Sequence, residues 1–332
     1  MPVTLHTFES ALLRGNPLGD TPVRRIPVYL PEAAFARTGA RFPVLYALAG
    51  FTGTGLSFLN YDFYQPNLPD TLDALIATGE MPPCVVVMVD GMTALGGNQY
   101  VDSPAVGPWA RHVTEELVPW AEETLPVLRG REHRGVFGKS SGGYGALMMA
   151  LEHAETFAAA ASHSGDCYFE YCYGADFPGA IDALRKAGGL EGWQAGWRHH
   201  PRLPSSAFPA VNIVAMSAFY SPAPGRPGAF DLPFDLETGE IRADVFARWK
   251  TRDPVELVAR QAEALRSLKL LFFDCGSRDE YHLHHGNRIL HTRLNAAGVP
   301  HVYETFDDGH RGIGYRVRAS LPRLVNALTP GS

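Results

Sequence analysis

The chain has 332 residues, of which 45% are hydrophobic and 19% charged, and this length suits one large α/β domain or two ordinary ones. Its 34 Gly and 26 Pro residues stay well below the share found in disordered or collagen-like chains, so the composition is globular. The net charge of −6 supplies no basic surface for a phosphate backbone, so we expect no nucleic-acid partner.

The four cysteines form no CxxC pair, so they indicate neither a zinc ribbon nor a redox motif, and we expect buried, idle thiols. The first ten residues lack a basic region followed by an apolar run. No stretch reaches the roughly 18 consecutive apolar residues that a membrane span needs. We therefore expect a cytoplasmic protein that does not associate with a membrane.

Short apolar runs recur along the chain and predict the strands of a sheet. The first, residues 23–30, mixes apolar and polar residues around Pro27 and is typical of an edge strand. The later runs are almost unbroken, which indicates strands that are covered on both faces, as in a parallel sheet. These runs are residues 42–48, 84–89, 135–137, 157–161 and 270–273, and a last strand is expected over 301–306.

Helical patterns lie between these runs. Residues 110–125 carry apolar side chains at every fourth position, and Pro119 predicts a kink or a restart there. A second pattern ends at Ala297, with Gly298 placed as its C-cap, and a last helix is expected over 316–328. This alternation predicts an α/β protein with a mostly parallel, doubly wound sheet and right-handed crossovers.

One long segment, residues 167–268, interrupts the alternation and is rich in Pro, Gly and aromatic residues. An insertion of this length usually forms a lid or a substrate-shaping segment, and we expect it to lie within a single domain over residues 1–332. Trp193 and Trp197 are candidates for apolar walls of a substrate pocket, and packing inside the insertion is the equal alternative.

The most informative segment is residues 138–142, Gly-Lys-Ser-Ser-Gly, a GxSxG pattern between the apolar run 135–137 and a predicted helix over 143–151. A strand, a sharp turn and a helix in this order hold the serine on a strained turn, where small neighbours avoid the adjacent strand and helix. We therefore predict that Ser140 is a nucleophile. The N–H of Ser141, at the helix N-terminus, is placed to donate to an oxyanion.

A serine nucleophile needs a base and an acid that orients the base, and in this fold they follow in the order Ser, Asp or Glu, His. Asp279 lies in a loop directly after an apolar strand and is the predicted acid. Asp274, at the strand end, and Glu280 are the alternatives. His310 is the predicted base, because it lies beside a glycine in the loop after the last strand.

The other oxyanion donor is expected from the loop 49–55, which would follow the third strand of such a fold. The N–H of Phe51 is the first candidate there and that of Thr52 the second. Tyr100 and Asp166, near the predicted strand ends on the same side of the sheet, are candidates for substrate binding.

The sequence disfavours three other chemistries. A P-loop would need glycine where residue 133 is His. The glycines of 49–55 have the spacing GxxGxG, which a dinucleotide fingerprint does not have. The histidines within 282–285 and at 199–200 suggest a metal site by composition, but no ligand spacing such as HExxH is present.

Four segments resemble the putative esterase family of α/β-hydrolases, which includes S-formylglutathione hydrolases, feruloyl and acetyl-xylan esterases, enterochelin esterases and mycolyltransferases. They are LYALAGF at 45–51, GKSSGGYGAL at 138–147, FDCGSRDEY at 273–281 and DGH at 308–310. Two positions depart from the common pattern, Ala49 and Lys139, where members of the family often carry His. Neither change removes a catalytic group.

The resemblance implies an α/β-hydrolase fold with the long insertion between the sixth and seventh core strands. It also implies a triad of Ser140, Asp279 and His310, with an oxyanion hole from the amides of Phe51 and Ser141. These groups predict a serine esterase that acts on a small-molecule ester or thioester through an acyl-enzyme, with no cofactor and no metal. The alternatives are an acyltransferase with the same triad and a non-catalytic binding protein; a homodimer is compatible with the sequence.

Overall fold

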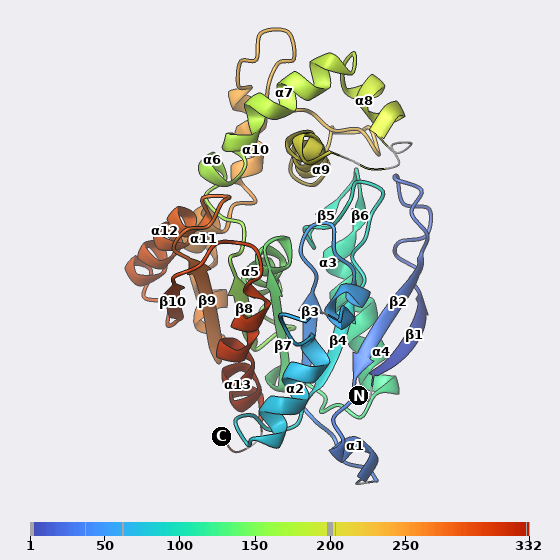
Figure 1. The fold of residues 1–332 in the computed structure, drawn as a ribbon, viewed down its shortest axis with the longest axis vertical. Helices are drawn as coiled ribbons and strands as arrows, with labels where there is room; N and C mark the ends of the chain where they lie inside the picture. The colour runs from blue at the N-terminus through green and yellow to red at the C-terminus, as the bar shows by residue number, and fades with distance from the viewer. Residues whose placement is uncertain are drawn as a thin grey trace.

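The computed structural model describes residues 3–36, 38–61, 63–197, 202, 204–329 and 331. Ten strands are present in this part of the chain: β1 (Val3–Glu9), β2 (Val23–Tyr29), β3 (Val44–Leu48), β4 (Val85–Val89), β5 (Asp102–Ser103), β6 (Gly107–Pro108), β7 (Arg134–Lys139), β8 (Ala159–His163), β9 (Leu270–Gly276) and β10 (Val302–Phe306). Eight of them form the central sheet in the order β1-β2-β4-β3-β7-β8-β9-β10 (Figure 1). Six neighbouring strands of this sheet, β4, β3, β7, β8, β9 and β10, are parallel, which confirms the predicted α/β architecture.

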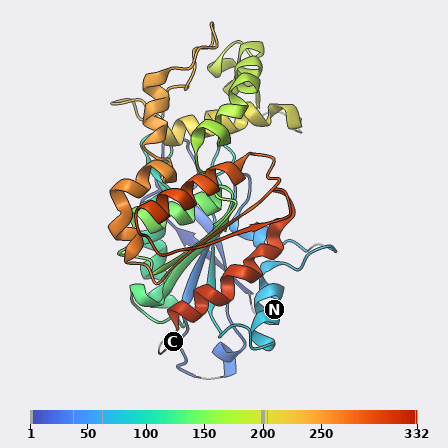
Figure 2. The ribbon, with the colours of Figure 1, turned by 90° about the vertical axis from the view of Figure 1, so that its left-hand side faces the viewer.

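Helices cover both faces of the sheet, as the unbroken apolar strands require. On one face, α2 (Leu68–Ala77) and α13 (Val317–Leu328) pack against side chains such as Leu45 and Ala47 of β3. On the other face, α4, α5, α11 and α12 pack against the alternate side chains Tyr46 and Leu48. Their bounds are Val118–Thr124, Ser141–Glu152, Pro254–Arg266 and Leu283–Ala296. The sheet is therefore doubly wound, with a hydrophobic layer on each face (Figure 2).

The prediction that residues 23–30 form an edge strand is wrong, because β1 lies outside β2 and pairs with it over its whole length. β1 carries alternating polar residues and most of its side chains are exposed, so it lacks the apolar run by which the other strands were found. Pro27 is tolerated inside the sheet because the ladder between β2 and β4 includes only Val28 and Tyr29.

The helix expected over 110–125 is interrupted in the way that Pro119 predicts. The short helix α3 (Trp109–Arg111) runs into a π-helical turn over His112–Leu117, and α4 then starts at Val118 with Pro119 in its first turn. Proline has no N–H to donate and is well tolerated in the first turn of a helix, which explains why α4 begins one residue before Pro119.

Between β8 and β9 the chain leaves the sheet and builds a layer of helices beyond one end of the strands (Figures 1 and 2). These helices are α6 (Phe169–Cys172), α7 (Phe177–Lys186), α8 (Leu190–Trp197), α9 (Phe208–Tyr220) and α10 (Ala243–Lys250). The next helix, α11, packs on α5 and α12, so the segment 167–268 contains a crossover helix of the sheet as well as this layer. In the described part of the chain, no helix has the length and apolar character needed to cross a bilayer.

Candidate active site

Ser140 lies in a strained turn between β7 and α5. Its backbone has φ 58° and ψ −127°, a combination that L-residues rarely adopt and that is typical of functional sites. The flanking glycines are required by space. A Cβ on Gly142 would lie 2.0 Å from the carbonyl oxygen of Leu48, and one on Gly138 would lie 2.4 Å from the backbone of Gly142.

Two backbone hydrogen bonds fix this turn. The N–H of Ser140 donates to the carbonyl oxygen of His163 on β8 (2.9 Å), and its own carbonyl accepts from the N–H of Tyr144 in α5 (2.8 Å). A cavity of about 460 Å³ lies beside the turn, and Ser140 and His310 both line it. The strand, turn and helix predicted from the GxSxG segment are thus present, with the serine at the cavity.

His310 is bound to Asp279. Its ring nitrogen Nδ1 lies 2.8 Å from Asp279 Oδ2, and the His310 side chain is 7% exposed while that of Asp279 is buried. Asp279 Oδ1 accepts from the backbone N–H of Tyr281 (2.9 Å) and, at 3.4 Å, from that of Leu283. Because Nδ1 is used by the acid, the other ring nitrogen is the one left to act on a hydroxyl.

The Asp279 carboxyl is held ionised. Burial opposes its ionisation, but the hydrogen bond and charge of His310, together with the backbone hydrogen bonds from Tyr281 and Leu283, outweigh burial, so the pKa of Asp279 lies below its ordinary value. An ionised carboxylate in this place fixes the tautomer of the imidazole and stabilises its protonated form.

The two alternative acids lie elsewhere. Asp274 is inside β9, where it binds His163 and Arg316. Glu280 accepts the backbone N–H of His310 through Oε2 (2.5 Å), so it holds the loop of the histidine instead of its ring. The geometry therefore favours Asp279, the first of the three candidates from the sequence.

The two predicted oxyanion donors flank the cavity, since Phe51 and Ser141 both line it. Ser141 is the first residue of α5, and the first N–H groups of a helix have no partner within it. The N–H of Thr52, the second candidate in the loop 49–55, is already donated to the carbonyl oxygen of Gly96 (2.8 Å). This bond favours Phe51 over Thr52, and the assignment of Phe51 and Ser141 stays a prediction.

Asp166 lines the same cavity and belongs to a buried hydrogen-bond network. Its Oδ2 accepts from the Oγ of Ser141 (3.2 Å) and from the hydroxyl of Tyr173 (3.0 Å), and Ser141 in turn accepts from Gln99 (2.7 Å). Burial raises the pKa of Asp166 to about 6, although the nearby His310 and the two hydroxyls act in the other direction. The pKa of Asp166, which lines the cavity, is thus shifted upward, whereas that of Asp279, buried behind His310, is shifted downward.

The other predicted binding residues take different positions. Tyr100 is buried below the loop 49–55, where its hydroxyl donates to the carbonyl oxygen of Ala49 (2.8 Å), so it supports that loop and not a substrate. Trp193 is buried in the hydrophobic core, which is the alternative left open for it. The side chain of Trp197 lies outside the described part of the structure.

The insertion contributes lining residues that sequence reasoning missed. They are Cys172, Tyr173, Phe208 and Asn212, and Tyr281 joins them from the loop after Asp279. The ring of Tyr281 meets that of His310 edge-on (centroids 4.8 Å apart) and packs against Phe208 (5.8 Å). Nothing local marks these residues in the sequence, because their positions depend on how the helix layer folds over the strand ends.

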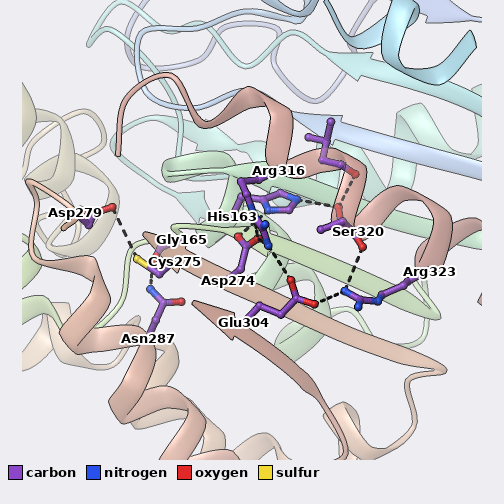
Figure 3. Close-up of polar contacts among 12 residues, drawn as sticks. His163, Gly165, Asp274, Cys275, Asp279, Asn287, Glu304, Arg316, Ser320 and Arg323 are labelled. Carbon is purple, nitrogen blue, oxygen red and sulfur yellow. Dashed lines mark hydrogen bonds and ion pairs between the residues drawn. The ribbon is translucent and has the colours of Figure 1, made fainter. Parts of the chain in front are cut away.

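A second Ser/His/Asp set lies deeper, between β8, β9 and α13 (Figure 3). His163 Nδ1 is 2.8 Å from Asp274 Oδ1, and its Nε2 is 2.8 Å from Ser320 Oγ. Asp274 also binds Arg316, which reaches Glu304 on β10 (both 2.8 Å). His163, Asp274 and Ser320 are at most 1% exposed, so no substrate reaches them, and the set joins the sheet to α13.

The described residues contain no group of three or more His, Cys, Asp or Glu side chains that could hold a metal ion. Of the histidines that suggested one, His199 and His200 lie outside the described residues, and the rings of His284 and His285 pack against each other (4.1 Å) at the start of α12. The four cysteines are free and buried, as expected.

Known protein families and proteins share sequence with much of this chain. The model of the putative esterase family matches residues 22–322. Esterase MT1326 of Mycobacterium tuberculosis is 32% identical over 162 residues, which cover 48% of this chain and 31% of that protein. The S-formylglutathione hydrolase of Mus musculus is 28% identical over 151 residues, which cover 43% of this chain and 52% of that protein. The chain thus matches between 31% and 52% of the length of these two curated relatives.

Solved structures extend the likeness over the whole fold. A ferulic acid esterase superposes with a TM-score of 0.66 at 21% identity, covering 98% of each chain. An S-formylglutathione hydrolase from Staphylococcus aureus gives a TM-score of 0.58 at 14% identity and covers 99% of this chain and 100% of its own. At such identities the likeness concerns the fold, which is that of the α/β-hydrolases. Together with the family match over residues 22–322, it shows that the chain belongs to the putative esterase family of α/β-hydrolases.

Proposed function

We propose that this chain is a serine esterase that hydrolyses a carboxylic ester or thioester through Ser140, His310 and Asp279. One observation carries the proposal. His310, bound to Asp279 at 2.8 Å, lines the same cavity as Ser140, which a strained turn presents at the N-terminus of α5. The family to which the chain belongs, and its likeness to esterases of known structure, support the same chemistry.

In the first step, the Oγ of Ser140 attacks the carbonyl carbon of the substrate while the Nε2 of His310 takes the hydroxyl proton. The imidazolium that forms is stabilised by Asp279, whose pKa below the ordinary value keeps it ionised at neutral pH. His310 then returns the proton to the leaving alcohol or thiol, and the acyl group stays on Ser140.

The negative charge that develops on the carbonyl oxygen is placed between the N–H groups of Phe51 and Ser141. Donors that are fixed before the reaction need no reorganisation when the charge appears, and the α5 dipole adds to their field. Water then enters on the same side, and its oxygen attacks the acyl carbon while His310 takes its proton. His310 gives this proton to the Oγ of Ser140 as the bond between Oγ and the acyl carbon breaks, and the carboxylic acid leaves. A cavity of about 460 Å³ suits a small-molecule substrate.

The test is the hydrolysis of 4-nitrophenyl acetate by the wild type and by Ser140→Ala, followed from the first milliseconds. We expect a rapid release of up to one 4-nitrophenol per chain, which reports the acyl-enzyme, and then slower turnover. Ser140→Ala should show neither phase while its circular dichroism and melting temperature match the wild type. Turnover by a folded Ser140→Ala at the wild-type rate would overturn the proposal.

A further inference from the structure

Two cations lie beside the two reacting residues. Lys139, the last residue of β7, directly precedes Ser140, and Arg311 directly follows His310. Both residues line the catalytic cavity. Lys139 also lines a second, smaller cavity of about 260 Å³, which opens between the segment before α2 and the start of α13 and is walled by Phe58, Pro66 and Val317.

Both cations are without a partner among the residues that the structure describes. In the described part of the chain, no hydrogen bond or ion pair engages the ammonium of Lys139 or the guanidinium of Arg311. The nearby acids are already occupied, since Asp279 binds the ring of His310 and Glu280 accepts the backbone N–H of the same residue. Arg316, five residues beyond Arg311, shows the opposite behaviour and is paired with Asp274 and Glu304.

The Lys139 side chain is only partly exposed, and this makes its lack of a partner costly. Burial lowers the pKa of its ammonium, although the charges of Asp279 and Glu280 act in the other direction. A partly desolvated charge without a partner destabilises the folded protein. A ligand of opposite charge that binds beside it offsets this cost.

We infer that the cavity takes an ester whose acyl or leaving group carries a carboxylate, and that Lys139 and Arg311 bind this anionic group. The inference rests on the proposed esterase function and names the substrate class of the same site. Asp166, the one acid among the described residues that line the cavity, is bonded to Ser141 and Tyr173 and marks the part of the cavity that an anion avoids. The anionic group is therefore expected at the end of β7, where Lys139 lies, and at the loop that carries His310 and Arg311.

Matched pairs of esters test this inference. In one pair the leaving group differs, 4-acetoxybenzoate against its neutral methyl ester; in the other the acyl group differs, the mono-4-nitrophenyl ester of adipic acid against 4-nitrophenyl hexanoate. For each pair, the ratio of kcat/KM for the anionic to the neutral ester is compared between variants, so that differences in intrinsic reactivity cancel. The variants are Lys139→Met, Arg311→Gln and, as a control on an exposed lysine of α7, Lys186→Met.

In the pair whose carboxylate reaches the two cations, we expect Lys139→Met to lower this ratio by about tenfold or more, the loss of one charged hydrogen bond. Arg311→Gln should lower it by roughly two- to fivefold, because an exposed guanidinium is screened by water and salt. Lys186→Met should leave it at the wild-type value. The pair that responds tells whether the carboxylate sits on the acyl or on the leaving group.

Ratios that stay at the wild-type value in both pairs, for both Lys139→Met and Arg311→Gln, would overturn the inference. An equal loss on the anionic and neutral esters would also overturn it, since a merely structural lysine acts on both. Arg311 is exposed, so Arg311→Gln remains informative even if Lys139→Met fails to fold. If the wild type hydrolyses the neutral esters and Ser140→Ala does not, the proposed esterase function stands whether or not the inference on Lys139 and Arg311 holds.

Discussion

The described part of the chain contains two Ser/His/Asp sets that share a short contact between histidine and aspartate and have very different surroundings. In both, the imidazole Nδ1 lies 2.8 Å from an aspartate oxygen. The set of His310 and Asp279 lies in loops at the strand ends and faces a cavity with Ser140. The set of His163, Asp274 and Ser320 lies between β8, β9 and α13, with every member at most 1% exposed (Figure 3).

The comparison indicates which features the proposed chemistry needs. A short contact between histidine and aspartate is not sufficient, since the sealed set has one and no substrate reaches it. Ser140 has three features that Ser320 lacks. It lies in a strained backbone turn, it lies at a helix N-terminus that presents free N–H groups, and it lines a cavity. Ser320 lies inside α13, where its hydroxyl also approaches the carbonyl oxygen of Val317 (3.3 Å).

The largest expected effect separates the two serines. Ser140→Ala should lower kcat by roughly 10⁴-fold or more, because the attacking group is lost, while the melting temperature stays near that of the wild type. Ser320→Ala should instead keep kcat near the wild-type value and destabilise the fold by about 1–3 kcal/mol, because His163 Nε2 loses its buried partner. Steady-state kinetics and urea denaturation of both variants measure the contrast. A loss of kcat in Ser320→Ala as large as in Ser140→Ala would break the distinction.

Asp279 and Asp274 should also differ, the first in its effect on kcat and the second in its effect on stability. Asp279→Asn should lower kcat by about 10³- to 10⁴-fold, because an amide favours the wrong tautomer of His310 and does not stabilise the imidazolium. Asp274→Asn should mainly cost stability, roughly 2–4 kcal/mol, because His163 and Arg316 lose their shared anion and Arg316 keeps only Glu304. The readouts are again kcat and the free energy of unfolding, and a catalytic defect without destabilisation in Asp274→Asn would contradict the account.

Asp166 gives a dependence of stability on pH. Burial raises its folded-state pKa to about 6, so the folded state holds this proton more tightly than the unfolded state. The stabilisation from the protonated group is complete below the ordinary carboxyl pKa and is lost as the pH rises to about 6. Asp166→Asn keeps the shape of the group and removes the titration, so its stability relative to the wild type should rise by on the order of 2 kcal/mol between pH 4 and 7. Urea denaturation at pH 4.5, 6 and 7.5 measures the difference, and a constant difference would refute the assignment.

The smallest expected effect concerns Tyr100. Tyr100→Phe leaves the carbonyl oxygen of Ala49 without its donor and should destabilise the protein by about 1–2 kcal/mol. Because Ala49 begins the loop 49–55, which carries Phe51, kcat should fall a few-fold while KM stays near that of the wild type. A rise in KM with an unchanged kcat would return Tyr100 to the substrate-binding role that the sequence first suggested for it.

Much of the fold follows from local patterns in the sequence. Five of the six parallel strands appear as apolar runs because helices cover them on both sides, and the turn around Ser140 is marked by glycines that its crowding requires. The polar edge strand β1 could not be found in this way, since only its pairing with β2 makes it a strand. The predicted partner of His310 came from chain order, which placed Asp279 in a loop after its strand and Asp274 at the strand end; the structure has Asp274 inside β9.

The substrate pocket could be predicted only in part. Trp193 was a candidate because it is large and aromatic, but it packs in the core, whereas Tyr173 and Phe208 reach the cavity. The difference depends on how the helices between β8 and α11 lie over the strand ends, and no spacing rule encodes that placement. Lys139 was visible as a departure from the family pattern, and only the structure shows that its charge has no partner among the described residues.

The central claim, that Ser140 and no other serine is the nucleophile, is tested most directly by labelling the native protein with a fluorophosphonate and mapping the modified peptide by mass spectrometry. A fluorophosphonate forms a stable bond only with a serine whose base and oxyanion donors are in place. We expect one label per chain, on Ser140, in the wild type and in Ser320→Ala, and no label in Ser140→Ala. Labelling of Ser320 or of another serine, or a folded wild-type protein that takes up no label, would contradict the account.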